Sequence, residues 1–246
     1  MNSHENAARQ SSDGKAVKPP RAILFDFDGT LVDSAPDLAG AVNDLRVERG
    51  LPAMPFEALR PYATYGARSL LKAGLDLSPE HDEYDATRRQ FLSIYDRRKL
   101  DKSHLFDGVL ELLIALERRG LTWGIVTNKL SRLAEPMIHD LLRDRAFTPA
   151  VVVCGDSTAT PKPNAAPLLL AARDAQIEAA ECWFVGDGEN DVRASHAAGM
   201  TAVLATYGYI PDLTVARNWG AHHEITRPLD LLGLLDQAGV VATPLW

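Results

Sequence analysis

The chain has 246 residues and is 46% hydrophobic, which is enough for one α/β domain with a large core and a smaller second domain. Its formal net charge is −7 and its basic residues are scattered, whereas a nucleic-acid-binding protein normally carries a basic face. No apolar run approaches the roughly 20 residues that a membrane-spanning helix needs. We therefore expect a cytoplasmic protein, monomeric or homodimeric, with neither a nucleic acid nor a membrane as its partner.

The first 20 residues are polar and end in two prolines, without the apolar segment of a signal peptide. This composition predicts a disordered tail over residues 1–20. The two cysteines, Cys154 and Cys182, adjoin apolar stretches and belong to no CxxC or Cys/His pattern. We expect both to be reduced thiols in the core.

Regular structure is predicted from residue 21 onward. Residues 22–25 form a short apolar run that stops at polar turn residues, as a buried parallel strand does. The apolar spacing then becomes helical, over residues 37–49, 69–73 and 82–98, and no strand is predicted among these helices. This change of character predicts a helical module over residues 35–102, inserted into a main domain made of residues 21–34 and 103–246.

Strands and helices alternate regularly in the second part of the chain. Strands are predicted at 122–126, 150–154, 182–186 and 202–205. Helices are predicted between 107 and 120, from about 135, and at 167–175, 191–198 and 228–235. The helix that follows the strand at 122–126 is expected to become regular only near Glu135, because Pro136 favours the first turn. The alternation predicts an α/β fold with a Rossmann-like, doubly wound parallel sheet.

Polar residues follow several of these strands directly. The carboxyl ends of parallel strands meet at one edge of a sheet, so these residues should gather there. They are Asp26, Asp28, Thr127, Asn128, Lys162, Asp187 and Asp191. The four carboxylates of this set would repel one another, and Lys162 supplies only one positive charge. A hard divalent cation with oxygen ligands, Mg²⁺, would supply two more.

The same residues fall into four motifs, in the order Asp26–Thr30, Thr127-Asn128, Lys162-Pro163 and Gly186–Asp191. In this order they resemble the haloacid dehalogenase superfamily of hydrolases. The resemblance implies a phosphatase in which Asp26 is the nucleophile that forms an aspartyl phosphate. It implies that Asp28 is the general acid and base.

The resemblance also assigns the remaining polar residues. Thr127 and Asn128 would hold phosphoryl oxygens, and Lys162 would stabilise the developing charge. Mg²⁺ would be held by Asp26, the main-chain carbonyl of Asp28, Asp187, and Asp191 directly or through water. Relatives often carry an acidic residue directly after the aspartate at 187, where this chain has Gly188 followed by Glu189, so the outer contacts of the metal stay open.

The helical module occupies the position of a cap that closes over the active site in this superfamily. Gly66 would present backbone N–H groups to an anion at the start of a helix. Arg68 would bind a substrate carboxylate, with a solvent-facing arginine as the equal alternative.

The whole chain resembles bacterial phosphoglycolate phosphatases, through residues 123–129, 134–136 and 207–210. It is also similar to the related enzymes that act on N-acetylmuramic acid 6-phosphate, through residues 66–68 and 218–221. The expected substrate is therefore a small carboxylate-bearing phosphate ester, 2-phosphoglycolate first and the amino-sugar acid second.

Three other functions are compatible with the same scaffold. A sugar phosphomutase shares both aspartates of the first motif, and the cap decides whether water or a sugar accepts the phosphoryl group. A dehalogenase does not need an acid at position 28, so Asp28 argues against it. A silent binding module has no need to keep the nucleophile, the acid, the lysine and the metal ligand together.

Overall fold

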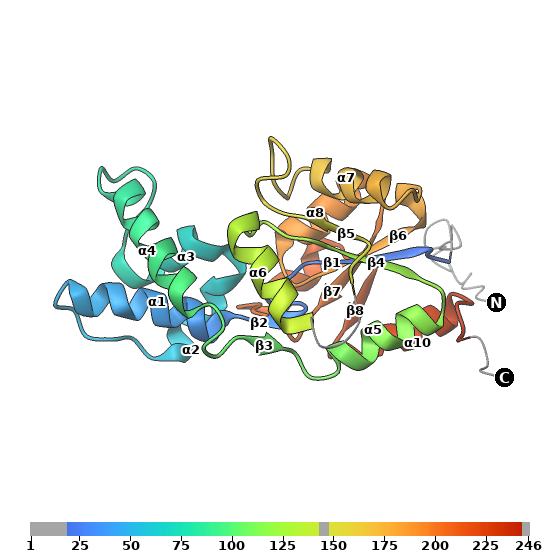
Figure 1. Cartoon of the computed structure of the whole chain (residues 1–246), viewed down its shortest axis with the longest axis horizontal. Helices are drawn as coiled ribbons and strands as arrows, with labels where there is room; N and C mark the ends of the chain where they lie inside the picture. The colour runs from blue at the N-terminus through green and yellow to red at the C-terminus, as the bar shows by residue number, and fades with distance from the viewer. Residues whose placement is uncertain (1–18, 143–147, 243–246) are drawn as a thin grey trace, which may run out of the picture.

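The computed structural model describes residues 19–142 and 148–242, so the predicted tail lies almost entirely outside the described residues. A six-stranded sheet forms the centre, in the order β5-β4-β1-β6-β7-β8, and all of its pairs are parallel (Figure 1). Its strands are β1 (Ala22–Phe25), β4 (Thr122–Val126), β5 (Val151–Val153), β6 (Cys182–Gly186), β7 (Thr201–Ala205) and β8 (His223–Ile225). The predicted parallel α/β fold is confirmed.

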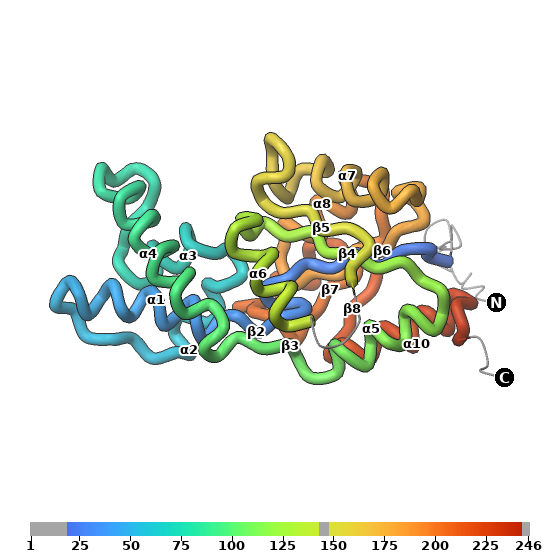
Figure 2. The backbone as a smooth tube through the Cα atoms, in the orientation of Figure 1, coloured from blue at the N-terminus to red at the C-terminus, as the bar shows by residue number. Residues whose placement is uncertain are grey.

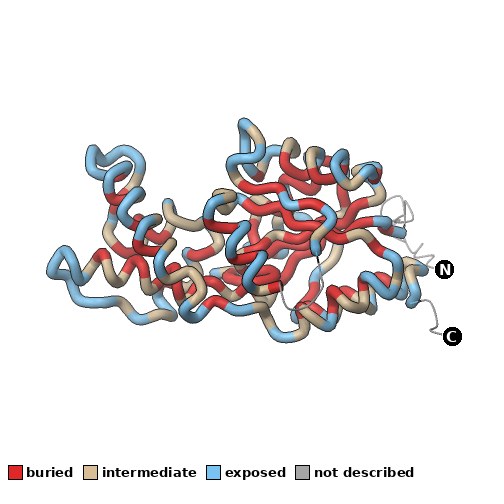
Figure 3. Tube along the Cα trace, in the orientation of Figure 1, coloured by how far each residue is buried: buried red, intermediate tan, exposed pale blue. Residues whose placement is uncertain are grey.

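Side chains alternate between the two faces of the sheet along each strand, and apolar side chains on both faces are covered by helices. In β1, Ile23 and Phe25 belong to one buried cluster, while Ala22 and Leu24 belong to another. The first cluster is covered by α5 (Val109–Arg118), α6 (Ser131–Leu142) and α10 (Asp230–Gln237). The second is covered by α7 (Ala166–Asp174) and α8 (Glu189–Ala198). The central strands are consequently buried from both sides (Figure 3).

A group of helices lies to one side of the sheet, at the left of Figure 1. It comprises α1 (Ala35–Glu48), α2 (Phe56–Leu59), the 3-10 helix η1 (Arg60–Tyr65), α3 (Gly66–Leu75) and α4 (Tyr84–Arg98). The chain enters and leaves this group through β2 (Val32–Asp33) and β3 (His104–Leu105), which pair antiparallel and run side by side in Figure 2. Buried Asp37 in α1 links the entering segment to the leaving one, because its Oδ2 accepts the backbone N–H of Ser103, directly before β3, at 2.8 Å.

Several elements differ from the sequence-based expectation, among them α6, α3 and β8. Helix α6 begins at Ser131 and runs through Pro136, because the carboxylate of Asp156 accepts both the N–H and the hydroxyl of Ser131 and so fixes the first turn. Helix α3 begins three residues earlier than expected, at Gly66. The edge strand β8 was not expected, since its sequence is short and mostly polar.

Other short helical segments complete the chain: η3 (Ala179–Glu181), α9 (Leu213–Ala216) and η4 (Arg217–Trp219). Both cysteines are free and buried, as expected.

Candidate active site

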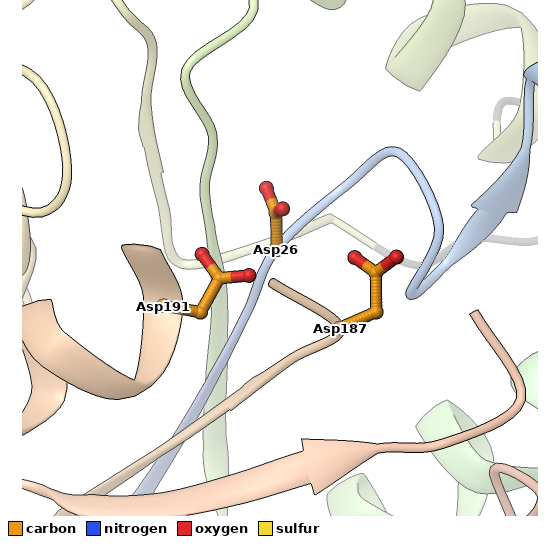
Figure 4. A group of neighbouring side chains, drawn as sticks. All are labelled: Asp26, Asp187 and Asp191. Atoms are coloured by element: carbon orange, nitrogen blue, oxygen red, sulfur yellow. The ribbon is translucent and has the colours of Figure 1, made fainter. Parts of the chain in front are cut away.

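Three carboxylates meet at the carboxyl edge of the sheet. Asp26 follows β1, Asp187 follows β6, and Asp191 lies in the first turn of α8. Each offers an oxygen within 4.8 Å of the others, and Figure 4 shows the three side chains around a common space. The strands β1 and β6 are neighbours in the sheet, which explains why residues so far apart in sequence meet here.

Lys162 is the cation of this cluster. Its Nζ lies 2.9 Å from Asp26 Oδ1 and 2.7 Å from Asp191 Oδ1, and donates to the carbonyl of Val126 at 2.8 Å. The side chain is 2% exposed, so these charges attract with little screening by solvent. Asn128 fixes the lysine backbone, since its side-chain oxygen accepts the Lys162 N–H at 3.0 Å and its amide donates to the Lys162 carbonyl at 2.9 Å. Sequence reasoning did not find this positioning role of Asn128.

One ammonium does not balance three carboxylates. Burial raises the pKa of Asp26 to about 7; Lys162 opposes the rise and Asp191 adds to it. Burial, followed by repulsion from Asp191 and Asp26, raises the pKa of Asp187 well above its usual value. The Oδ2 atom of Asp187 accepts the N–H of Tyr209 at 2.8 Å, while its buried Oδ1 has no hydrogen-bond partner in the described residues. Excess negative charge and an unsatisfied carboxylate oxygen fit a hard divalent cation.

Two glycines make room for the Asp187 carboxylate. Gly29 has φ +81°, and a Cβ there would lie 2.3 Å from Asp187 Oδ2. A Cβ at Gly208 would lie 2.3 Å from Asp187 Cβ and 2.6 Å from the carbonyl oxygen of Gly29. The first motif indicated the turn at Gly29, but nothing in the sequence near position 208 marked its contact with Asp187.

The Asp28 carboxylate belongs to a separate network. Lys129 Nζ lies 2.9 Å from its Oδ1 and 3.1 Å from its Oδ2, and Ser34 also donates to Oδ1. The same ammonium donates to Tyr95 Oη at 2.8 Å, which connects Asp28 to helix α4. Sequence reasoning missed Lys129, although its position directly after Asn128 at the end of β4 is a signal that could have found it. The metal contact expected of Asp28 was through its main-chain carbonyl, and that stays a prediction.

A cavity of about 390 Å³ lies between this sheet edge and the helical group. The core contributes Asp26, Asp28, Thr127, Asn128, Lys129, Leu130, Leu133 and Asn190. The helical group contributes Leu38, Ala63, Thr64, Tyr65, Gly66, Ala67, Arg68, Arg88, Phe91, Leu92 and Tyr95. The predicted residues Gly66 and Arg68 therefore face the same space as the predicted nucleophile, and Arg68 is exposed.

Besides the contact between Lys129 and Tyr95, Arg60 and Thr64 connect the helical group to the active-site edge. Arg60 Nη1 donates to the carbonyl of Gly208 at 3.1 Å, and its guanidinium lies 5.0 Å from the ring centre of Tyr209. The Thr64 hydroxyl lies 3.4 Å from Asp187 Oδ2. The helices are thus held directly over the carboxylate cluster.

A model of the haloacid dehalogenase-like hydrolase family matches residues 23–205, which include all four motifs. The chain belongs to this family. An N-acetylmuramic acid 6-phosphate phosphatase from Pseudomonas putida is 38% identical over 219 residues, which cover 89% of this chain and 97% of the relative. A phosphoglycolate phosphatase from Xanthomonas campestris pv. campestris is 42% identical over 193 residues, covering 77% and 85% of the two chains.

A solved structure supports membership of the same family. The crystal structure of a predicted phosphoglycolate phosphatase from Haemophilus somnus 129pt has a TM-score of 0.75 and 28% sequence identity, covering 88% of this chain and 98% of that one. The predicted family is confirmed, and family and relatives together support a phosphoric monoester hydrolase. Within the described residues, the helices are all too short or too polar to cross a membrane.

Proposed function

We propose that this protein is a Mg²⁺-dependent phosphomonoesterase that acts through an aspartyl phosphate on a small carboxylate-bearing phosphate ester. The observation that carries the proposal is the cluster of Asp26, Asp187 and Asp191, in which Lys162 pairs with Asp26 and Asp191 and Asp26 lines the cavity. The names of the relatives supply two candidate substrates, 2-phosphoglycolate and N-acetylmuramic acid 6-phosphate. Both carry a phosphate and a carboxylate.

Asp26 acts as the nucleophile, and its two oxygens have different surroundings. Oδ1 accepts the N–H of Phe27 at 2.7 Å and lies 2.9 Å from Lys162 Nζ. These two donors fix the carboxylate, so Oδ2 is the oxygen that attacks phosphorus while the bond to the leaving oxygen breaks. The Lys162 ammonium stabilises negative charge that develops beside Oδ1.

Asp28 lines the cavity beside the nucleophile and handles the proton. It donates a proton to the departing substrate oxygen, and afterwards removes one from the water that attacks the phosphorus of the intermediate. Lys129 and Ser34 hold its carboxylate in place. The Thr127 hydroxyl oxygen accepts the Lys129 N–H at 3.1 Å, so the hydroxyl proton of Thr127 points away from Lys129. We assign this hydroxyl proton and the Asn128 N–H as donors to the phosphoryl oxygens.

Asp26, Asp187 and the main-chain carbonyl of Asp28 would hold Mg²⁺. Asp191 would contribute through water, because its two oxygens already face Lys162 and the N–H of Gly188, at 2.7 and 2.9 Å. When bound, the cation supplies two positive charges that offset the carboxylates and the phosphate. Residues 35–102 would act as a cap over the main domain of residues 21–34 and 103–246, with Gly66 and Arg68 as substrate contacts.

Phosphate release with Mg²⁺ from 2-phosphoglycolate and from N-acetylmuramic acid 6-phosphate, measured side by side, tests the proposal. We expect turnover of at least one substrate, and none after Mg²⁺ is removed with a chelator. Turnover that is unaffected by the chelator would contradict the metal assignment. No phosphate release from either ester would contradict the function.

Asp28→Asn should affect substrates according to their leaving groups. An alkyl phosphate leaves as a strongly basic alkoxide and needs a proton, so its turnover should fall on the order of 10²- to 10⁴-fold. p-Nitrophenyl phosphate has a weakly basic leaving group, and formation of the intermediate should slow far less. Single-turnover kinetics on both esters measure this step. An equal loss for the two would mean that Asp28 does not protonate the leaving oxygen.

Gly208→Ala should displace Asp187, because the added Cβ would overlap its side chain and the Gly29 carbonyl. We expect Mg²⁺-dependent kcat/KM to fall by roughly 10- to 100-fold, as when a contact that orients a metal ligand is lost. The free energy of unfolding should fall by about 1–3 kcal/mol. Gly233→Ala on α10 is the matched control, since a Cβ there meets nothing within 4 Å. Wild-type kinetics for Gly208→Ala would show that Asp187 has no fixed position.

A further inference from the structure

Helix α4 presents one continuous face to the cavity. The residues on it are Arg88, Phe91, Leu92 and Tyr95, at spacings of three, four and seven, and all four line the cavity. Sequence analysis gave this helix no part in binding. Its cavity face carries one cation, two apolar side chains and one phenol.

The phenol end of this face lies near the chemistry. Tyr95 Oη accepts from Lys129, which in turn holds the Asp28 carboxylate. Arg88 lies seven residues earlier, which is roughly 10 Å further along the helix at ~1.5 Å per residue. Long helical side chains lean toward the N-terminus, which directs the Arg88 guanidinium still further from Asp28. The face therefore runs from the proton-transfer group to a distant cation.

Of the three cations that line the cavity, Lys129 pairs with Asp28, whereas Arg88 and the more exposed Arg68 form no ion pair within the described residues. Further along α4, Arg98 pairs with Asp44, and Lys99 directly after the helix pairs with Asp96. Among residues 19–142 and 148–242, no acidic side chain forms an ion pair with Arg88. Its side chain is half-buried, and a half-buried guanidinium beside apolar side chains binds an anion more strongly than an exposed one does.

We propose that Arg88 binds the carboxylate of the substrate, and that the substrate is longer than a two-carbon acid. The inference rests on the proposed phosphatase function. A substrate with its phosphate at Asp26 and its carboxylate at Arg88 has to span the cavity along α4. A two-carbon phospho acid has roughly the volume of four water molecules of ~30 Å³ each. It would therefore fill only about a third of the cavity volume of 390 Å³.

The wall between the two ends fits the body of such a substrate. It consists of Phe91 and Leu92 from α4, with Leu130 and Leu133 opposite them at the start of α6. Apolar side chains of this kind contact an acylated sugar ring and offer nothing to a two-carbon acid, which is charged at both ends. Arg68, by contrast, is exposed, so solvent screens its attraction for a carboxylate more strongly.

A pair of esters that differ by the carboxylate-bearing lactyl group tests this inference. N-Acetylmuramic acid 6-phosphate carries this lactyl ether, and N-acetylglucosamine 6-phosphate has a free hydroxyl in its place. The full chain with Mg²⁺ should prefer the first over the second, and over 2-phosphoglycolate, in kcat/KM. In Arg88→Gln, kcat/KM for the carboxylate ester should fall on the order of 10- to 100-fold, mainly through KM. In the same variant, kcat/KM for the ester without the carboxylate should fall much less.

Two further variants separate binding from packing. Arg88→Lys should keep part of the preference, because the charge remains without the bidentate geometry. Arg89→Gln, a change at the exposed neighbour outside the cavity, should behave like the wild type.

An equal fall in kcat/KM for both sugar esters in Arg88→Gln would overturn the inference. Loss of the preference for the carboxylate ester in Arg68→Gln, with the preference kept in Arg88→Gln, would also overturn it. A wild-type preference for 2-phosphoglycolate would overturn the length assignment. If the wild type hydrolysed none of the three esters, the proposed function itself would fall, and the inference with it.

Discussion

Asp26→Asn is expected to reduce kcat by on the order of 10⁴-fold or more for every phosphate ester tested. The asparagine has the size of the aspartate, and its oxygen can still accept from Phe27 and Lys162 at the position of Oδ1. The atom that replaces Oδ2 is an amide nitrogen, which cannot attack phosphorus. Turnover of p-nitrophenyl phosphate measures the loss without dependence on the cap.

The matched control for this variant is Asp174→Asn, which neutralises an exposed carboxylate on α7 whose one ion-pair partner within the described residues is its neighbour Arg173. It should leave kcat unchanged. Both variants should remain folded, because Asp26→Asn removes one of several crowded negative charges. Turnover by folded Asp26→Asn at the wild-type rate would exclude Asp26 as the nucleophile.

Asp187→Asn is expected to remove the response of the protein to Mg²⁺. A cation that binds only the folded state raises the melting temperature, so wild-type protein should melt at a higher temperature as Mg²⁺ is added. The variant loses the buried carboxylate whose Oδ1 accepts no hydrogen bond from the described part of the chain, and its melting temperature should not change with Mg²⁺. Without metal the variant should be at least as stable as the wild type, because fewer buried carboxylates repel one another. Phosphatase activity should fall by at least about 10²-fold.

Glu189→Gln is the control for this pair of measurements. Glu189 lies two residues after Asp187 but does not belong to the carboxylate cluster of the candidate metal site. Its side chain lies 3.8 Å from Arg193 on α8. It should keep the rise in melting temperature with Mg²⁺. A persistent Mg²⁺ response in Asp187→Asn would place the metal elsewhere.

The sheet and its active edge could be predicted because each signal is local. Apolar runs such as residues 22–25 and 182–186 end at an aspartate, and parallel topology places those ends together. The short strand β8 could not be predicted, since its mostly polar residues pair along one edge of the sheet only. Helix α6 passes through Pro136 because a carboxylate 25 residues from Ser131 fixes its start, and no local pattern reveals that.

The candidate site divides in the same way. Residues within the four motifs were predicted from their spacing, whereas Lys129, Arg88 and Gly208 were not. Lys129 gains its role from its ion pair with Asp28 and its contact with Tyr95 on α4, which are 101 and 34 residues away along the chain. Gly208 matters because the loop after β7 passes directly over Asp187. Arg88 faces the cavity because of the packing of α4 over the core. These roles depend on contacts between distant segments, which spacing along the chain does not encode.

The covalent intermediate proposed at Asp26 can be tested by chemical trapping. In Asp28→Asn, the water that hydrolyses the intermediate lacks its base, so transfer of phosphate from p-nitrophenyl phosphate to Asp26 should be faster than hydrolysis of the acyl phosphate, which should accumulate. Borohydride reduces an acyl phosphate to an alcohol, and peptide mass spectrometry then finds the converted side chain. We expect homoserine at position 26, only in the presence of substrate and Mg²⁺. Conversion at another residue, or none at position 26 while phosphate is still released, would contradict an aspartyl-phosphate mechanism.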